Sequence, residues 1–346
     1  MTFQNTSNIL VGNNAQGKTT LLEAIHVLAF TKSHKNIKDD ILIQNNADYA
    51  KIKGLMNFND RKVSLELILS KNGKKAKYNG IEMNRLSEYV GQLNVVLFAP
   101  EDLDLVKGNP KTRRRFLDLE LGQTSKDYLS IMKQYQKILK DRNQLLKKMQ
   151  SMSKKDYMLL DVITEQLISY QSKIVIYRKD FLEDINEIAN KYYKFISNED
   201  HELEMKYIPS IQEDYEKLYK SKYELDLMTG TTNLGVHRDD IEFYLDGNVV
   251  KNYASQGEQR TIVLAIKLGL TNYIYRQTKR YPVFLLDDVL SELDTKRQNK
   301  LFEIIDKNIQ TFITTTNINE IQENVLKTAT IYEIKMGSIE EMKYDV

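Results

Sequence analysis

Gly12-Asn13-Asn14-Ala15-Gln16-Gly17-Lys18-Thr19 is the stretch that decides the fold of this chain. It fits the pattern G-x-x-x-x-G-K-[ST] at every fixed position. The apolar run 8–11 before it is typical of a strand, and residues 20–30 after it carry apolar side chains at helical spacing. This strand–loop–helix context favours a phosphate-binding loop over a glycine loop that only turns the chain.

A loop of this kind binds phosphate through its backbone. Glycines let the chain curl so that successive N–H groups point at phosphate oxygens, and the start of the next helix adds a partial positive charge. We expect Lys18 to reach the β- and γ-phosphates and the Thr19 hydroxyl to hold Mg²⁺. The residues predicted to bind the nucleotide here are Gly12, Asn13, Asn14, Ala15, Gln16, Gly17, Lys18, Thr19 and Thr20.

Composition limits the class of protein. A chain of 346 residues is most naturally two structural units. The 50 basic and 48 acidic side chains leave a net charge of +2, so a nucleic-acid surface must gather its positive charge in patches. The lack of cysteine excludes disulfides and thiolate metal sites. No apolar run approaches the roughly 20 residues that span a bilayer, and we expect a cytoplasmic protein with no membrane contact.

The pattern changes twice along the chain. Residues 1–122 and 229–346 alternate strand and helix signals, and residues 123–228 read as a helical arm inserted between them. Within the arm, apolar side chains recur at steps of three and four on both sides of Ser151–Asp156, with Arg142 interrupting the first row. Such rows predict two antiparallel helices that bury each other's apolar stripes.

The flanking parts predict an α/β head split by the arm. We expect strands at 9–11, 49–58, 62–69, 93–98, 241–245, 249–253, 282–286 and 310–314, and helices at 84–90, 255–275 and 295–308. Asn72-Gly73, Asn79-Gly80 and Asp246-Gly247 predict tight turns with positive φ angles.

A second motif supplies carboxylates. Asp287 and Asp288 follow the apolar strand 283–286, and we expect that strand to lie beside the phosphate-loop strand, at the sheet edge where ligands bind. Asp287 and Thr19 form the predicted metal site, and Asp288 is expected to orient or deprotonate the attacking water. The alternative is that both carboxylates only cap the next turn. The predicted catalytic residues are Lys18, Asp287 and Asp288.

A third motif opens the predicted helix 255–275. Ser255 at the N-cap with Glu258 three residues on satisfies the first N–H groups without any ligand. That local explanation leaves Gly257 unexplained, because glycine weakens a first helical turn. The other explanation is that a phosphate approaches the backbone at Gly257. The sequence favours neither the capping explanation nor the phosphate explanation. The residues assigned to the nucleotide by this motif are Ser255, Gly257, Glu258 and Gln259.

Together these motifs resemble, in order, the Walker A, signature, Walker B and D-loop (Ser291–Asp294) motifs of ABC-type ATPases. Gly17 and Gly257 are 240 positions apart, a gap wider than in transporter subunits and far narrower than in SMC-type ATPases. A gap of this size with a modest arm resembles the RecF family. Three further stretches are similar to blocks of that family: Phe98–Asp102, Gly108–Asp118 and Gly235–Asp240.

The resemblance implies an ABC-type P-loop ATPase head, in an ATP-dependent homodimer with two ATP molecules and Mg²⁺ between the copies. Ser255 and Gly257 of one copy would face the γ-phosphate bound by Lys18 of the other. RecF-like function would be engagement of double-stranded and gapped DNA in replication, repair and the SOS response. RecR and RecO would be partners in loading RecA.

Departures from the family pattern modify these expectations. Family members usually carry a further strand and an aromatic and basic turn before the loop, so we expect the first part of the head to be N-terminally short, with an exposed sheet edge. Asp288 stands where a longer Glu is common, which implies slow, weak DNA-dependent hydrolysis. Thr314–Asn317 replaces the usual switch histidine, and Glu101 aligns with the usual Q-loop glutamine.

Basic clusters are candidates for phosphate contacts with DNA, which carry no sequence information and weaken with salt. Arg113–Arg115 has a rival role in subunit contacts or nucleotide sensing. The candidates are Lys74, Lys75, Lys77, Arg113, Arg114, Arg115, Lys147 and Lys148. Other functions that remain open are an SMC-like structural ATPase that recruits protein partners, a transporter-type motor, and an ATP-binding scaffold without hydrolysis.

Overall fold

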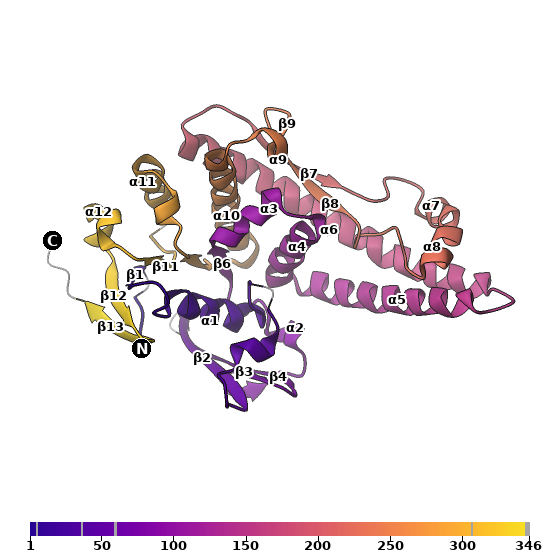
Figure 1. Ribbon diagram of the computed structural model, residues 1–346, viewed down its shortest axis with the longest axis horizontal. Helices are drawn as coiled ribbons and strands as arrows, with labels where there is room; N and C mark the ends of the chain where they lie inside the picture. The colour runs from indigo at the N-terminus through magenta and orange to yellow at the C-terminus, as the bar shows by residue number, and fades with distance from the viewer. Residues whose placement is uncertain (5, 36, 59–60, 306, 343–346) are drawn as a thin grey trace. The chain divides into compact units, whose positions relative to one another are not determined.

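The computed structural model describes residues 1–4, 6–35, 37–58, 61–305 and 307–342. Figure 1 shows the elements in chain order. The chain divides into two compact units. The head unit comprises Met1–Leu103, Ile188–His201 and Ala254–Val346, and the arm unit comprises Asp104–Glu187 and Glu202–Tyr253. These bounds differ from the expected divisions after residues 122 and 228, because segments on both sides of the long helices pack with them in the arm unit.

A six-stranded sheet organises the head unit, in the order β13-β12-β1-β11-β10-β6. The strands are β1 (Ser7–Val11), β6 (Val95–Phe98), β10 (Val283–Leu286), β11 (Thr311–Thr315), β12 (Thr330–Lys335) and β13 (Ser338–Met342). All neighbours pair in parallel except β12 and β13. Every residue of β6 and β11 is buried, as expected for strands covered on both faces.

One expectation about this sheet is wrong. The carboxylate-bearing strand β10 does not lie beside β1, because β11 pairs with both, through Ile9↔Ile313 on one side and Leu285↔Phe312 on the other. Since all three strands run in the same direction, their carboxyl ends still meet at one edge of the sheet. That edge therefore also presents the end of β11, at Thr314 and Thr315.

The head helices are α1 (Lys18–Phe30), α10 (Gln256–Thr278), α11 (Thr295–Ile304) and the short α12 (Glu323–Leu326), with 3-10 turns η1 (Asp39–Leu42), η2 (Pro100–Leu103), η3 (Leu290–Glu292) and η4 (Ile318–Glu320). The middle of α10, residues 261–271, is buried on every side. A helix that is apolar all round belongs in a core, and this burial fixes the start of α10 relative to the strands.

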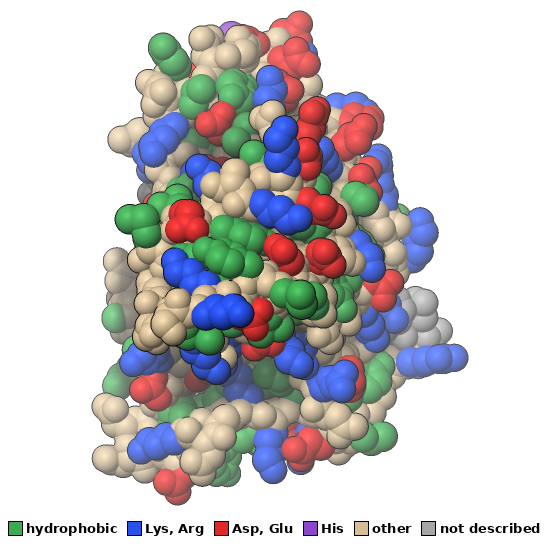
Figure 2. Space-filling view, turned by 90° about the vertical axis from the view of Figure 1, so that its right-hand side faces the viewer, with side chains coloured by type: hydrophobic (Ala, Val, Ile, Leu, Met, Phe, Trp, Pro, Cys, Tyr) green, Lys and Arg blue, Asp and Glu red, His purple; other side chains and the backbone are tan. Residues whose placement is uncertain are grey.

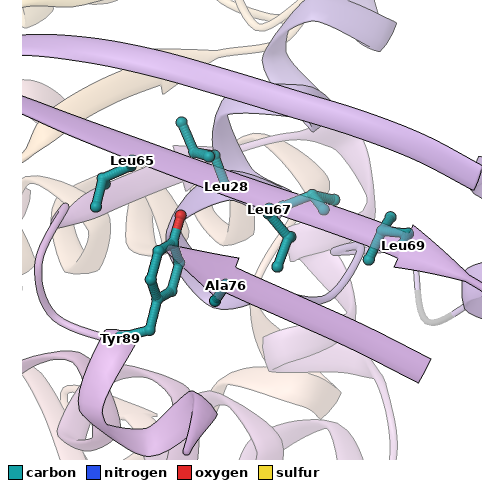
Figure 3. Packing of buried hydrophobic residues seen from close by; sticks show 7 residues of the cluster. Leu28, Leu65, Leu67, Leu69, Ala76 and Tyr89 are labelled. Atoms are coloured by element: carbon teal, nitrogen blue, oxygen red, sulfur yellow. The ribbon is translucent and has the colours of Figure 1, made fainter. Parts of the chain in front are cut away.

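A second, antiparallel sheet joins β2 (Tyr49–Phe58), β3 (Arg61–Ser70), β4 (Gly73–Tyr78) and β5 (Ile81–Glu82), followed by α2 (Leu86–Tyr89). Its inner face packs on the end of α1 through a cluster that includes Leu28, Leu65, Leu67, Leu69, Ala76 and Tyr89 (Figure 3). The Asn79-Gly80 turn has the expected positive φ angles of 50° and 83°. At the other turn Ser70 pairs with Gly73, and only Gly73 is left-handed, so the expected role of Asn72 is wrong.

The arm unit contains α3 (Asp104–Lys107), α4 (Pro110–Thr124), α5 (Lys126–Gln150), most of α6 (Tyr157–Ser197), β7 (Leu203–Ile208), α7 (Tyr215–Ser221), α8 (Tyr223–Thr229), β8 (Asp240–Leu245), β9 (Asn248–Val249) and α9 (Val250–Tyr253). The expected strand 249–253 is wrong after Val249, because the chain turns helical at Val250. Strand β7 lies inside the arm, where the sequence pattern predicts only helix, and β8 pairs with it in antiparallel register.

The predicted helical hairpin is confirmed as α5 and α6 (Figure 1). The two helices are antiparallel, since the Tyr128 and Tyr177 ring centroids lie 5.6 Å apart at one end while Arg142 Nε donates to Thr164 Oγ1 at 2.9 Å nearer the turn. No helix in the described part of the chain has the length and apolar content to cross a bilayer.

Candidate nucleotide-binding site

The loop between β1 and α1 has a backbone conformation that requires glycine at its two ends. Gly17 is the N-cap of α1 and is left-handed, with φ 107°. At the other end of the loop, a Cβ on Gly12 would lie 2.4 Å from the carbonyl oxygen of Ile334 in β12, so that close approach requires glycine. Asn13, Asn14 and Ala15 are exposed between these two anchors. The loop therefore presents backbone to solvent at the start of a helix.

Lys18 is the first residue of α1, and its side chain folds back onto this loop. Its Nζ donates to the carbonyl oxygens of Gly12 at 2.5 Å and Asn13 at 3.0 Å, and the residue is 8% exposed. Burial lowers the pKa of Lys18, and the nearby carboxylates of Asp288 and Asp287 oppose that shift. The lysine ammonium is therefore bound to the carbonyl oxygens of the loop and lies within electrostatic reach of the two aspartates.

Asp287 joins the two motifs. Its Oδ1 accepts from Thr19 Oγ1 at 3.0 Å and from Thr314 Oγ1 at 2.8 Å. The carboxylate is 5% exposed, and its backbone N–H donates to Phe98 O at 2.9 Å in the neighbouring strand. Residues 268 positions apart in the sequence thus form one polar cluster at the carboxyl edge of the sheet.

Asp288 follows at the surface. It is exposed and left-handed, with φ 53°, and its backbone N–H donates to Thr314 Oγ1 at 2.8 Å. Left-handed backbone is uncommon outside glycine and is tolerated best by Asp and Asn. The strained turn sends Asp287 into the sheet edge and leaves Asp288 next to solvent.

Thr314 is a site residue whose role the sequence did not show. It begins the stretch Thr314–Asn317 that the family resemblance places where a switch histidine is usual, and a hydroxyl or amide of that stretch is expected to sense the γ-phosphate. Thr314 itself is 1% exposed and connects Asp287 to the backbone of Asp288. Its position next to Asp287 depends on the register between β10 and β11, and no local pattern reports that register.

Gln16 has a supporting contact that sequence also missed. Its side-chain Oε1 accepts from Met336 N at 2.7 Å and its carbonyl oxygen accepts from Gly337 N at 3.0 Å. The turn between β12 and β13 therefore holds the loop from the side. Thr20, in contrast, is exposed in the first turn of α1.

The signature-like stretch forms the N-terminal end of α10. Ser255 and Glu258 make the predicted capping box, with Ser255 Oγ accepting from Glu258 N at 3.3 Å and Glu258 Oε2 accepting from Ser255 N at 2.6 Å. The hydrogen bond from Ser255 lowers the pKa of Glu258. Gln259 points inward, since it is 4% exposed and its amide donates to Ala254 O. Gln259 thus has a structural contact and is hidden from a surface ligand.

The loop and the signature-like stretch have separate hydrogen-bond partners within the chain. In the described ranges, no hydrogen bond or ion pair connects residues 255–259 with residues 12–19. Both stretches belong to the head unit.

The arginine run of the predicted DNA surface is mostly structural. Arg113 is 7% exposed and binds the Asp240 carboxylate through Nε at 2.6 Å and Nη2 at 2.8 Å. Arg114 Nη1 donates to Asp239 O at 2.7 Å. Burial lowers the pKa of both Arg114 and Arg115. We therefore correct the expectation for Arg113, because a buried guanidinium paired with a carboxylate cannot reach a DNA phosphate.

The lysine candidates divide by exposure. Lys74 bridges Asp39 Oδ1 at 2.7 Å and Thr31 O at 2.5 Å with a side chain only 12% exposed, so its expected DNA contact is also corrected. Lys75 and Lys77 face Glu82 at 3.8 Å and Glu66 at 3.5 Å. Lys147 and Lys148 are exposed in the last turn of α5. On the face in Figure 2, basic side chains are interspersed with acidic ones, and no single basic field covers it.

The residues present fit a triphosphate with a divalent cation. The loop offers backbone N–H groups and a lysine, and Thr19 and Asp287 place a hydroxyl and a carboxylate 3.0 Å apart beside it. Hydroxyl and carboxylate oxygens are the ligands that Mg²⁺ prefers. No cluster of three or more His, Cys, Asp or Glu that could hold a metal by itself occurs among the described residues.

Comparisons with known proteins identify similar chains. Residues 1–340 match the family described as RecF/RecN/SMC N terminal domain. The chain is 46% identical over 351 residues to the DNA replication and repair protein RecF of Bacillus mycoides (strain KBAB4), covering 98% of this chain and 94% of the relative. It is 45% identical over 350 residues to its counterpart in Geobacillus thermodenitrificans (strain NG80-2), with the same coverage.

Solved structures agree in fold. The recombination mediator protein RecF-ATP of the RecFOR pathway superposes with a TM-score of 0.90 at 31% identity, covering 99% of this chain and 93% of that one. The Smc head domain derived from Pyrococcus furiosus superposes with a TM-score of 0.53 at 15% identity, covering 99% and 91%. The second likeness concerns the fold alone.

Proposed function

This chain belongs to the RecF family, and we propose that it is an ATP-dependent DNA-binding protein of DNA replication and recombinational repair. Relatives that match 98% of its length carry the name DNA replication and repair protein RecF. The observation that carries the proposal is the Thr19–Asp287 contact beside Lys18, which joins the phosphate loop and the carboxylate strand into one site.

The residues of this site divide the work of binding and cleavage. The loop from Gly12 to Thr19 and the Lys18 ammonium bind the β- and γ-phosphates of ATP. Thr19 and Asp287 would hold Mg²⁺, which would neutralise charge on the phosphates when bound. Thr314 keeps the Asp287 carboxylate oriented. Asp288 is exposed beside the site and orients the attacking water as general base.

The proposed cycle is an ATP-dependent homodimer with slow hydrolysis. Ser255 and Gly257 lie in the head unit without a hydrogen bond to the chain's own loop, which fits a role at the nucleotide of a second copy. ATP then favours the dimer only if it binds the closed pair better than the single chain. The dimer engages double-stranded DNA near single-strand gaps in the cytoplasm and, with RecR and RecO, helps load RecA.

The DNA contact rests on the exposed lysines at the end of α5. Lys147 and Lys148 are the candidates least committed to partners within the chain, and they bind phosphates without reading sequence. Lys75 and Lys77 contribute less, because Glu82 and Glu66 lie close to their ammonium groups. An SMC-like structural role fits less well, since α5 has only 25 residues.

The test is the molecular mass in solution with ATP, ADP and no nucleotide, measured by light scattering. We expect dimers with ATP alone. Lys18→Ala should lose nucleotide binding, and Asp288→Ala should keep it and accumulate dimers. A mass that ATP leaves unchanged in folded protein would refute the switch, and an Asp288→Ala chain that cannot bind ATP would refute the assigned base.

DNA binding has its own test. Reversing charge at Lys147 and Lys148 should weaken duplex binding and lower its salt dependence, by about one unit of slope for each DNA phosphate that the protein no longer neutralises. Lys133→Glu, an exposed lysine nearer the start of α5, is the matched control. If the double reversal leaves the slope as it was, the end of α5 does not contact DNA.

A further inference from the structure

The start of α10 has a capping box formed within the chain. Ser255 and Glu258 satisfy each other's backbone N–H groups, so neither side chain needs a ligand for the helix to begin. The N–H groups of Gln256 and Gly257 precede the first intrahelical bond and have no acceptor within the helix. This end of the helix therefore keeps a partial positive charge.

Among the described residues, neither the backbone conformation nor a close contact requires glycine at position 257. Its φ is not among the left-handed values of the described residues. In the part of the chain that the structure describes, a Cβ placed there would meet only the Arg297 guanidinium, with Nη1 at 3.5 Å and Nη2 at 4.0 Å, which is ordinary van der Waals contact. Glycine in a helix costs about 1 kcal/mol relative to alanine, so the position calls for an explanation outside the chain.

Arg297 is the neighbour that makes this end of the helix distinctive. It lies in the first turn of α11, where the Asp294 carboxylate accepts from Arg297 N at 2.9 Å and from its Nη1 at 3.1 Å. One carboxylate thus fixes both the backbone and the guanidinium. A guanidinium has five N–H donors, so the bond to Asp294 does not by itself exhaust it, and the side chain is 28% exposed.

The electrostatics of this arrangement favour an anion. A cation at a helix N-terminus is disfavoured by the helix dipole, and Glu258 feels the charge of Arg297, which helps lower the pKa of that carboxyl. A phosphate group near Gly257 would accept from the backbone and from the guanidinium at once. Arginine suits this task because its planar fork matches phosphate oxygens.

We propose that Arg297 binds the γ-phosphate of the nucleotide held by the Gly12–Thr19 loop of a second copy. The inference rests on the proposed ATP-dependent dimer and adds to it a residue outside the predicted site. Asp294 then has a positioning role, since it holds the guanidinium against Gly257. The site is completed by two helix starts, those of α10 and α11.

The first experiment separates binding from dimerisation. In Arg297→Gln, the affinity of the single chain for ATP should change less than about twofold, whereas ATP-dependent dimerisation should weaken by about tenfold or more, as expected for a lost charged hydrogen bond. Arg297→Lys should fall between, because it keeps the charge and loses the fork. Lys296→Gln removes the same charge from the adjacent exposed position and should dimerise like the parent.

The second experiment tests action across the interface. Mixing Lys18→Ala with Arg297→Gln chains should restore ATP-dependent dimers and ATP cleavage, since each mixed pair holds one intact loop facing one intact arginine. If Arg297 acts on its own chain's nucleotide, or only caps α11, mixing restores nothing and the inference is overturned. An unmutated chain that fails to dimerise with ATP would instead overturn the proposed function itself.

Discussion

Replacing Arg142 by Met should strongly destabilise the arm unit. Arg142 and Asp226 are both completely buried, with Nη1 to Oδ2 at 2.8 Å. The guanidinium also donates to Thr164 and Thr232. Methionine keeps most of the volume but leaves the Asp226 charge buried without its partner. Breaking a buried pair from one side costs about 3–5 kcal/mol, which corresponds to a urea midpoint lowered by about 2 M.

The assay is urea unfolding followed by far-UV circular dichroism, with hydrogen exchange of α5 and α8 to locate the loss in the arm unit. Lys140→Met, an exposed change on the same helix, should stay within about 0.5 kcal/mol of the parent. Combining Arg142→Met with Asp226→Asn should cost less than the two single changes together, by about 1–3 kcal/mol. Additive costs, or a loss below about 1 kcal/mol for Arg142→Met, would show that the buried Arg142–Asp226 pair does not stabilise the arm unit.

Two further predictions concern the site and the pH dependence of stability. Thr314→Val removes the hydroxyl that donates to Asp287 and accepts from Asp288 N, so ATP cleavage should fall while ATP affinity persists. Thr311→Val, on the same strand, is the control. Equal losses of cleavage and affinity in Thr314→Val, or a cleavage rate no lower than that of Thr311→Val, would contradict the role of Thr314. His237 donates from Nε2 to Thr232 O and accepts at Nδ1 from Tyr135, and burial lowers its pKa. Below about pH 6.5 the histidine is protonated in the unfolded chain but stays neutral in the folded chain, so the free energy of unfolding should fall from pH 7 to 5. In urea unfolding series at several pH values, His237→Gln should reduce the dependence of this free energy on pH. An unchanged pH dependence would show that His237 is not its cause.

Local sequence patterns predicted most of the helices and strands, and the residues of the site that lie within single short motifs. The phosphate loop, the helix after it, the hairpin α5–α6 and the capping box at Ser255 all depend on residues close together in sequence. Their physical causes, glycine backbone freedom, apolar periodicity and helix capping, act over a few residues. That is why the sequence predicts Lys18 and Thr19 in one loop, and Asp287 at the end of a buried strand.

Some predicted DNA contacts were wrong because the charge of a side chain does not indicate which residue it pairs with. Lys74 and Arg113 read as phosphate contacts in the sequence, yet Asp39 and Asp240 hold them in place. Arg142 reads as an interruption of an apolar row, and it is completely buried in an ion pair with Asp226. In each case the partner lies on another element, brought near only by packing.

The sequence by itself determined that this chain has a phosphate loop, a carboxylate strand, a capped glycine-bearing helix start and a helical arm, because each is encoded within one short segment. Only the tertiary structure decided that β11 separates β1 from β10, that Thr314 thereby orients Asp287, and that Arg297 lies against Gly257. Strand order and helix packing join residues far apart in the chain, and they follow from burying all the apolar faces at once, which no single segment specifies.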